Sequence, residues 1–147
     1  MRALVQRVSE ASVVVQGSVT GQIGNGLLVL LGIRSDDTHA RAELLARKVV
    51  QLRVFPDDQG KMNRSLLDIS GELLVVPQFT LYGDTDKGNG PSYSKAATPD
   101  IAEPLYDYFV KLCRDKSVPV STGIFRAHMQ VRLVNEGPVT LMCYSES

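Results

Sequence analysis

The sequence is poor in the residues from which many catalytic and metal sites are built. Its two cysteines, Cys113 and Cys143, form neither a CxxC pair nor a metal-ligand pattern. Its two histidines, His39 and His128, stand apart, and no cluster of carboxylates accompanies them. We therefore expect no metal site, and we interpret both cysteines as small buried hydrophobic residues.

Excess charge of one sign and long apolar runs are also missing. Lys and Arg together number 16, as do Asp and Glu. No positive field over the whole protein attracts nucleic acid, so any such contact must be small and local. No run approaches the ~20 apolar residues of a membrane span, and the N-terminus "MRALVQRVSE" does not resemble a signal peptide. We expect a cytoplasmic protein that binds neither membranes nor DNA.

The common nucleophile and phosphate motifs are absent as well. The chain has no GxSxG elbow and no Walker loop. His39 begins a charged helical segment, and His128 lies on the polar face of a predicted strand, so we interpret both as surface residues. If the protein is an enzyme, we expect it to act through backbone groups and positioning.

What is present predicts one α+β domain over residues 1–147, a small, mostly antiparallel, β-barrel-like domain with two helices. Short valine-rich segments predict strands in the first third, followed by a central strand over 27–33. One helix, capped by Asp36 or Asp37, should bury Ala42, Leu45, Ala46 and Val49. A second helix, which starts or kinks at Pro104, should bury Ile101, Leu105, Tyr108, Phe109 and Leu112. Alternation over 125–133 predicts a strand, and "NEGP" predicts a turn before a last strand.

One stretch, "LLVVPQFTLYGD" (73–84), places a proline inside an apolar strand. Proline cannot donate to a sheet ladder. Pro77 is therefore either a guard on an edge strand or the end of the ladder. In the second case the amides of Gln78, Phe79 and Thr80 stay free to face a ligand oxygen.

A second unusual stretch, "NEGPVT" (135–140), combines a flexible residue with a proline. Gly137 permits φ values closed to other residues, and Pro138 makes a cis bond accessible. The stretch is either a plain hairpin turn or a cis Gly-Pro unit that presents carbonyl acceptors to a ligand ammonium.

Together the two stretches resemble motifs of the D-aminoacyl-tRNA deacylases, once called D-tyrosyl-tRNA deacylases. That family carries Ser-Gln-Phe-Thr-Leu and Asn-x-Gly-Pro-(Val/Met)-Thr, which stand here as "PQFTL" (77–81) and "NEGPVT" (135–140). The likeness runs nearly end to end, through "ALVQRV", "VTGQIGNGLLVLLGI", "GKMN", "PSYSKAATPD", "LYDYFV" and "MQVRLVNEGPVT".

The resemblance implies a homodimer that binds the acceptor end of aminoacyl-tRNA. It would hydrolyse the ester bond of D-aminoacyl-tRNA, and of glycyl-tRNA, without a metal or organic cofactor. The implied catalytic residues are Gln78, Phe79 and Thr80, assisted by the 2′-hydroxyl of the tRNA. The implied substrate-binding residues are Pro77, Gly137, Pro138, Arg7, Phe125 and Met129, and we add Lys95 because of its position in the long loop.

Within this set, Gly137 and Pro138 of the partner, in cis and fixed by Arg7, would reach the pocket and exclude L side chains. Phe125 and Met129 would lie near the terminal adenosine and the aminoacyl group. Lys95, together with Lys87 in the loop 82–98, is a candidate for phosphate contacts.

The chain departs from the family at two positions. Pro77 stands where the family motif begins with serine, and Gly90 stands where an arginine is expected. Two other functions stay open from the residues alone. One is an esterase with Thr80 as its nucleophile, and the other is a non-enzymatic module that binds a small amine-bearing ligand.

Overall fold

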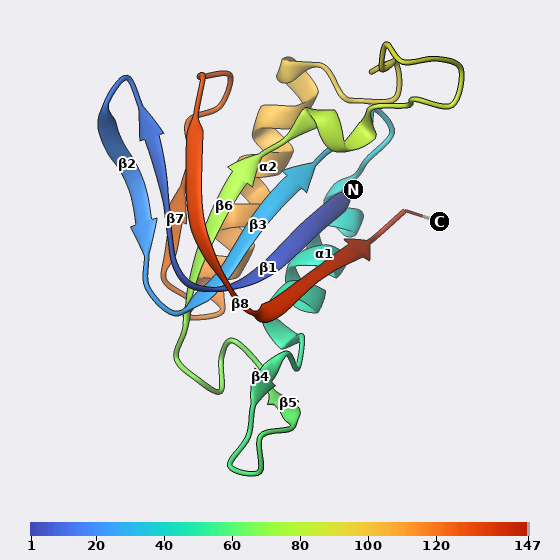
Figure 1. Cartoon of the computed structure of the whole chain (residues 1–147). Coiled ribbons are helices and arrows are strands. Elements are labelled where there is room, and N and C mark those ends of the chain that lie inside the picture. Colours follow the sequence, from blue (N-terminus) through green and yellow to red (C-terminus); the bar gives the residue numbers. More distant parts are fainter. Residues whose placement is uncertain (147) are drawn as a thin grey trace.

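The structure is a computed structural model that describes residues 1–146. A curled β-sheet carries both long helices against one of its faces (Figure 1). The elements in chain order are β1 (Arg2–Val15), β2 (Ser18–Ile23), β3 (Gly26–Gly32), α1 (His39–Gln51), β4 (Phe55–Pro56), β5 (Met62–Arg64), β6 (Glu72–Pro77), the 3-10 helix η1 (Phe79–Tyr82), α2 (Pro99–Asp115), β7 (Val120–Thr122) and β8 (Gln130–Tyr144).

The main sheet is mixed. It runs β2–β1–β3–β6–β7, with β8 paired to β1. The strand β1 pairs antiparallel with β2, β3 and β8, whereas β3–β6 and β6–β7 are parallel. The sequence suggested short strands in this region, but Arg2–Val15 is one long strand. Its first half pairs with β3 and its second half with β2, so β1 joins two parts of the curl.

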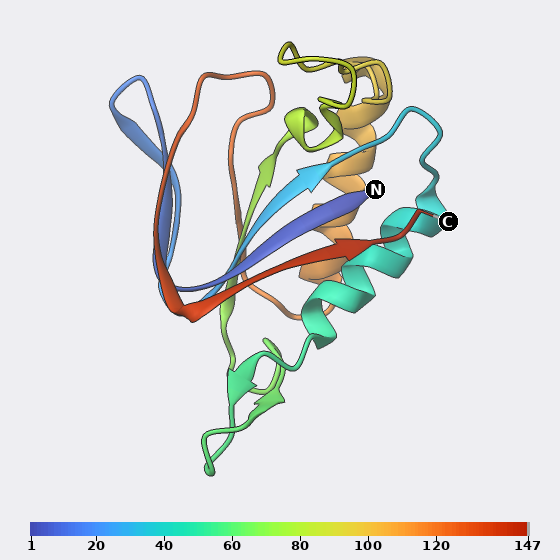
Figure 2. The same ribbon diagram turned by 45° about the vertical axis from the view of Figure 1, so that its right-hand side comes forward.

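The curl nearly closes where β2 approaches β7 (Figure 2). Ser121 Oγ of β7 donates a hydrogen bond to Gln22 O of β2 at 3.2 Å. A Cβ added to Gly21 would lie only 2.5 Å from Thr122 O, so glycine permits this approach. A small apolar cluster fills the inside of the curl, formed by Val8, Ala11, Val13, Ile23, Leu28, Leu74 and Val76. The predicted β-barrel-like α+β fold with two helices is confirmed.

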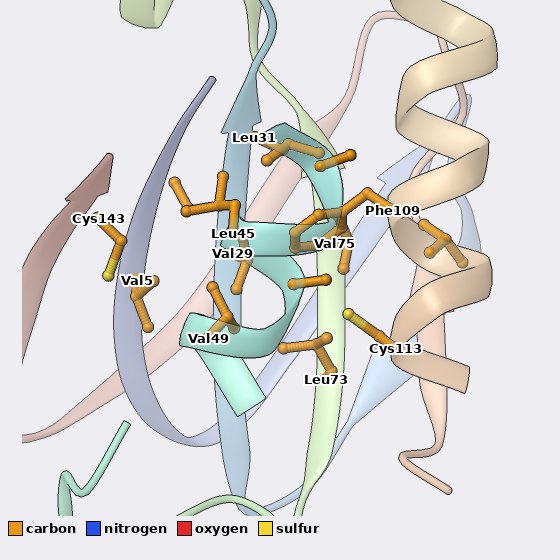
Figure 3. Packing of buried hydrophobic residues seen from close by; sticks show 14 of the residues in the cluster. Val5, Val29, Leu31, Leu45, Val49, Leu73, Val75, Phe109, Cys113 and Cys143 are labelled. Atoms are coloured by element: carbon orange, nitrogen blue, oxygen red, sulfur yellow. The ribbon is translucent and has the colours of Figure 1, made fainter. Parts of the chain in front are cut away.

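The larger core lies between the sheet and the two helices. In Figure 3, Val29 and Val75 of the sheet lie among Leu45 of α1 and Phe109 of α2. Cys113 is also buried here, and burial raises the pKa of its thiol to about 12. A neutral thiol at physiological pH behaves as a small apolar side chain, which confirms the sequence interpretation for this cysteine.

The start of α1 differs from the sequence prediction. The N-cap is Thr38, whose Oγ1 accepts from the Arg41 amide at 3.3 Å, and not Asp36 or Asp37. The Asp37 side chain is instead fully buried, where its carboxylate accepts from the Met1 ammonium at 2.8 Å. The four apolar residues expected to face the core are all buried.

The second helix contains Pro104 in its interior, which rules out the alternative that it starts there, and its buried face is rotated slightly from the predicted one. It begins at Pro99, where a proline costs no hydrogen bond, and continues through Pro104. Leu105 and Phe109 are buried as expected, but Ile101 is exposed. The buried positions Ala102, Tyr106, Val110 and Cys113 lie one residue further along the helix than the predicted stripe.

The C-terminal part contains two corrections. Residues 125–129 form a loop, and β8 begins only at Gln130. "NEGP" is no hairpin turn, because β8 continues through it to Tyr144. Gln6 pairs with Thr140 and Val8 pairs with Asn135, so four residues bulge out opposite Arg7. Asn135 Nδ2 closes the bulge by donating to Arg7 O and Val139 O at 2.9 and 3.0 Å.

The predicted cis bond is also wrong for this structure. Residues 1–146 contain no cis peptide bond, so Gly137–Pro138 is trans. The trans isomer is favoured by about 0.5–1 kcal/mol even before proline. Gly137 turns the chain through its φ of +102° instead.

Candidate functional site

A cavity of about 550 Å³ opens at the carboxyl ends of β3 and β6. Five residues singled out from the sequence line it, namely Pro77, Gln78, Phe79, Phe125 and Met129. The remaining wall comes from the ends of β3 and β6, the start of α2, the β7–β8 loop and the start of β8, through Leu31, Ile33, Val76, Ala97, Pro99, Ala102, Arg126, Ala127, His128 and Val131. The fold therefore brings the "PQF" stretch and the 125–131 segment into one largely apolar hollow.

Pro77 lies where β6 loses one of its neighbours. The strand β7 pairs with β6 only as far as Val75. Backbone N–H groups alternate between the two sides of a strand, and the Gln78 amide donates toward β3, to Leu31 O at 2.8 Å. The ring nitrogen of Pro77 therefore faces the side that β7 has left, so its missing N–H costs no ladder bond.

The sequence suggested that the amides of the three residues after Pro77 are all free. One of the three is in fact paired. Gln78 N–H is paired, whereas Phe79 and Thr80 begin η1 and their amides have no acceptor within residues 1–146. Phe79 is 57% exposed, and its ring meets the Tyr93 ring edge-on, at a centroid distance of 5.1 Å. Phe79, with its unpaired amide and its ring, thus belongs to the cavity lining, whereas Thr80 is not among the lining residues.

The Thr80 hydroxyl lacks a basic neighbour. Its Oγ1 accepts a hydrogen bond from Gln78 Nε2. A side-chain amide cannot take up a proton at neutral pH, and no histidine or carboxylate in the described chain bonds to Thr80 Oγ1. Thr80 therefore lacks the base that an activated hydroxyl nucleophile requires.

The β7–β8 loop forms the opposite wall. Phe125 tilts against Tyr106 at a centroid distance of 6.1 Å. Tyr106 Oη in turn donates to Val75 O at 2.6 Å, and burial raises the pKa of this phenol. Met129 fills the space beside Gly123, where an added Cβ would meet its sulfur at 2.7 Å.

Two lining residues, Arg126 and His128, were missed by the sequence reasoning. The assumed strand alternation placed them on the face opposite Phe125 and Met129. Because the segment is a loop, side chains from consecutive positions can reach the same cavity. The Gly123 that precedes the segment was the available signal for a loop.

Other expected site residues lie away from this cavity. Arg7 binds two backbone oxygens at the β8 bulge, with Nη1 donating to Val54 O at 2.6 Å and Nε to Glu136 O at 3.2 Å. Arg7 is paired with Leu27 near the start of β3, whereas the cavity lies beyond Leu31 at its end. Gly137 and Pro138 are exposed at the bulge, and neither lines the cavity of its own chain.

Lys95 is exposed in the long loop after η1, and it does not line the cavity either. Its backbone oxygen accepts from the Ser35 amide at 3.0 Å, which ties the loop to the segment before α1. In the described part of the chain, no group of three or more His, Cys, Asp or Glu side chains could hold a metal ion. No helix among residues 1–146 is long and apolar enough to cross a membrane.

The family profile described as "D-Tyr-tRNA(Tyr) deacylase" matches residues 4–144, a range that includes both motifs. The chain belongs to this family. It is 58% identical to a protein named D-aminoacyl-tRNA deacylase from Thermosipho africanus, over 99% of this chain and 98% of the relative. A protein of the same name from Chloroflexus aurantiacus is also 58% identical, over 97% and 89% of the two chains.

Solved structures agree with the fold. A structure titled "c-Myc DNA Unwinding Element Binding Protein" covers all of both chains with a TM-score of 0.95 and 42% identity. A probable eukaryotic D-amino acid tRNA deacylase covers 97% of each chain with a TM-score of 0.81; at 21% identity it supports the fold alone. The predictions of the family, and of an enzyme of the deacylase class, are confirmed.

Proposed function

We propose that the protein hydrolyses the ester bond of D-aminoacyl-tRNA and of glycyl-tRNA, in the cytoplasm where these esters are made and used. Water adds to the ester carbonyl, the bond to the ribose oxygen breaks, and the amino acid and tRNA leave. The observation that carries this proposal is the cavity beside "PQFTL", which offers backbone donors and apolar walls but no side-chain nucleophile with a base.

The proposed mechanism relies on positioned backbone groups. The free amides of Phe79 and Thr80 would donate to the ester oxygen, where negative charge develops. Phe125 and Met129 would hold the terminal adenosine against the apolar wall. The 2′-hydroxyl of the terminal ribose would assist proton transfer beside these amides, because the one histidine of the lining, His128, belongs to the opposite wall.

The proposed active form is a homodimer. The strand β8 has no neighbour on its outer edge within residues 1–146, and it exposes Val134, Leu141, Met142 and Tyr144. An unpaired edge strand with exposed apolar side chains favours association with another chain. A two-fold axis near β8 could bring the bulge of one chain to the cavity of the other.

The proposed selectivity follows from that arrangement. Gly137 and Pro138 of the partner would offer backbone carbonyls to the substrate ammonium. With the ammonium and the ester both held, an L side chain would collide with the Gly-Pro backbone, whereas a D side chain would point away. Glycine has no side chain and would also be accepted.

Matched D- and L-aminoacyl-tRNAs test the proposal directly. The protein should release D-tyrosine from D-tyrosyl-tRNA at least about 100-fold faster than L-tyrosine from the L ester, a difference of roughly 2.7 kcal/mol. Heat-treated protein serves as the control for spontaneous hydrolysis. Equal rates for the two esters would contradict the proposed pocket.

A further inference from the structure

The β7–β8 loop contains an arginine in a backbone conformation that suits glycine. Ala127 N–H donates to Ile124 O at 3.2 Å, which closes a turn over residues 124–127. Its third residue, Arg126, has a φ of +68°. A turn with positive φ at this single position is of the type that prefers glycine or asparagine there, because a Cβ is crowded in the left-handed region.

Arg126 differs from the other residues that share this strain. Gln16, Ser70 and Ser117 also have positive φ in the described chain, and none of them lines the cavity. Residues with a strained backbone conformation cluster at functional sites, and they persist only where the surrounding structure holds them in that conformation. An arginine kept in a glycine conformation at the cavity wall therefore indicates a use for its side chain.

The charge of the cavity supports such a use. Arg126 is the one permanently charged side chain among the lining residues, and no carboxylate lines the cavity. Within residues 1–146, no hydrogen bond or ion pair engages the Arg126 guanidinium, and the side chain is exposed. The site thus presents an unneutralised cation with forked donors beside an apolar hollow.

We propose that Arg126 binds the phosphodiester on the 5′ side of the terminal nucleotide of the tRNA. This inference rests on the proposed function. If the terminal nucleoside occupies the cavity, the acceptor strand leaves through its mouth, and the first phosphate follows directly after the ribose. A guanidinium can bind two phosphate oxygens at once, which fixes the position of the strand as well as its charge.

A pair of small substrates isolates this contact. Both are D-aminoacyl esters of adenosine, and they differ only in a 5′-phosphate. The wild-type protein should show a KM about tenfold lower for the phosphorylated ester, the effect expected for one charge-assisted hydrogen-bonded contact. Arg126→Gly should lose this preference and keep its kcat, while Arg126→Lys should keep part of it.

Stability and salt dependence give independent readouts. Arg126→Gly removes backbone strain, so its melting temperature should not fall below that of the wild type. Its slope of log kcat/KM against log salt, measured on D-aminoacyl-tRNA, should be shallower by about 0.7, as for one contact to a single strand. Ser117→Gly is the matched control, because it relieves a similar φ outside the cavity and should leave KM and the slope unchanged.

The two hypotheses fail separately. If the wild-type protein leaves D-aminoacyl-tRNA intact, the proposed function is wrong. If it cleaves that substrate but Arg126→Gly retains the phosphate preference, the assignment of Arg126 is wrong. A loss of kcat at unchanged KM would also overturn it, because a contact to a phosphate distant from the ester should affect binding.

Discussion

At the scale of single residues, the environment of Thr80 distinguishes two mechanisms. In one the Thr80 hydroxyl is the nucleophile, and in the other positioned backbone groups assist the hydrolysis. Its hydroxyl is exposed and accepts a hydrogen bond from an amide, whereas the adjacent backbone donors are free. If Thr80 is the nucleophile, removal of its hydroxyl should abolish activity. If backbone groups position the substrate instead, the same removal should cost little activity.

We expect Thr80→Ala to keep its activity within about tenfold, because no bond to the substrate carbon is lost. Removal of a true nucleophile costs on the order of 10⁶-fold in kcat. Single-turnover assays on D-aminoacyl-tRNA, with mass spectrometry of quenched enzyme, measure both points. An acyl group trapped on Thr80 would contradict the backbone mechanism.

At the scale of elements, the sequence predicted the regular segments well and the interruptions poorly. The apolar run 27–33 correctly predicted the strand β3, and the 3.6-residue pattern of apolar residues correctly predicted the helix α1. Local periodicity directly reflects which side chains are buried. The loop 125–129 alternates like a strand only by coincidence, and nothing local opposes that interpretation apart from Gly123.

The "NEGP" bulge shows a second reason why local sequence does not predict every interruption of a strand. A turn and a bulge use the same residue types, Asn, Gly and Pro. What distinguishes them here is Arg7, far away in sequence, which binds Glu136 O while Asn135 binds Arg7 O. Only the first motif lies at the end of an element and contributes to the cavity lining, whereas the second lies inside β8 and away from the cavity of its own chain.

The parallel pairing of β3 with β6 depends on a glycine. A Cβ at position 26 would lie 1.8 Å from Glu72 O, a backbone atom that cannot move without disturbing the ladder. We expect Gly26→Ala to lower the free energy of unfolding by about 3 kcal/mol or more. Urea denaturation measures this value.

Gly24→Ala provides the control for that substitution. Its added Cβ would meet nothing within 4 Å, so its stability should stay within about 0.5 kcal/mol of the wild type. If both variants were equally stable, the close approach at Gly26 would not be a constraint on the sheet.

At the scale of the whole molecule, an ionic cluster joins both ends of the chain to its middle. The Met1 ammonium lies 2.8 Å from Asp37 and 3.3 Å from Glu146, and Arg2 Nε lies 2.8 Å from Glu146. Burial alone would raise the pKa of Glu146, but hydrogen bonds from Tyr82, Arg2 and the ammonium outweigh it and hold the pKa below its usual value.

A depressed carboxyl pKa stabilises the fold above the unfolded value of 4.5 and loses this effect as the pH falls through the folded value. Glu146→Gln should therefore melt about 3 °C lower at pH 7, and this difference should shrink below about pH 4. Differential scanning calorimetry at both pH values measures it. Asp115→Asn, which removes an exposed pair with Lys111, should change little at either pH.

The cavity and the Gly137–Pro138 bulge lie at opposite ends of β3. The proposed homodimer, in which the bulge of one chain reaches the cavity of the other, therefore predicts genetic complementation between two defective copies. Ala127→Trp should block the cavity, and Gly137→Val should displace Arg7, whose Nη2 lies 2.1 Å from the added Cβ position. Each variant alone should be inactive. Coexpressed in equal amounts, they should form mixed dimers in which one site receives both intact parts, so that about a quarter of the wild-type activity returns. Persistent inactivity of the isolated mixed dimer would mean that each chain builds its site alone.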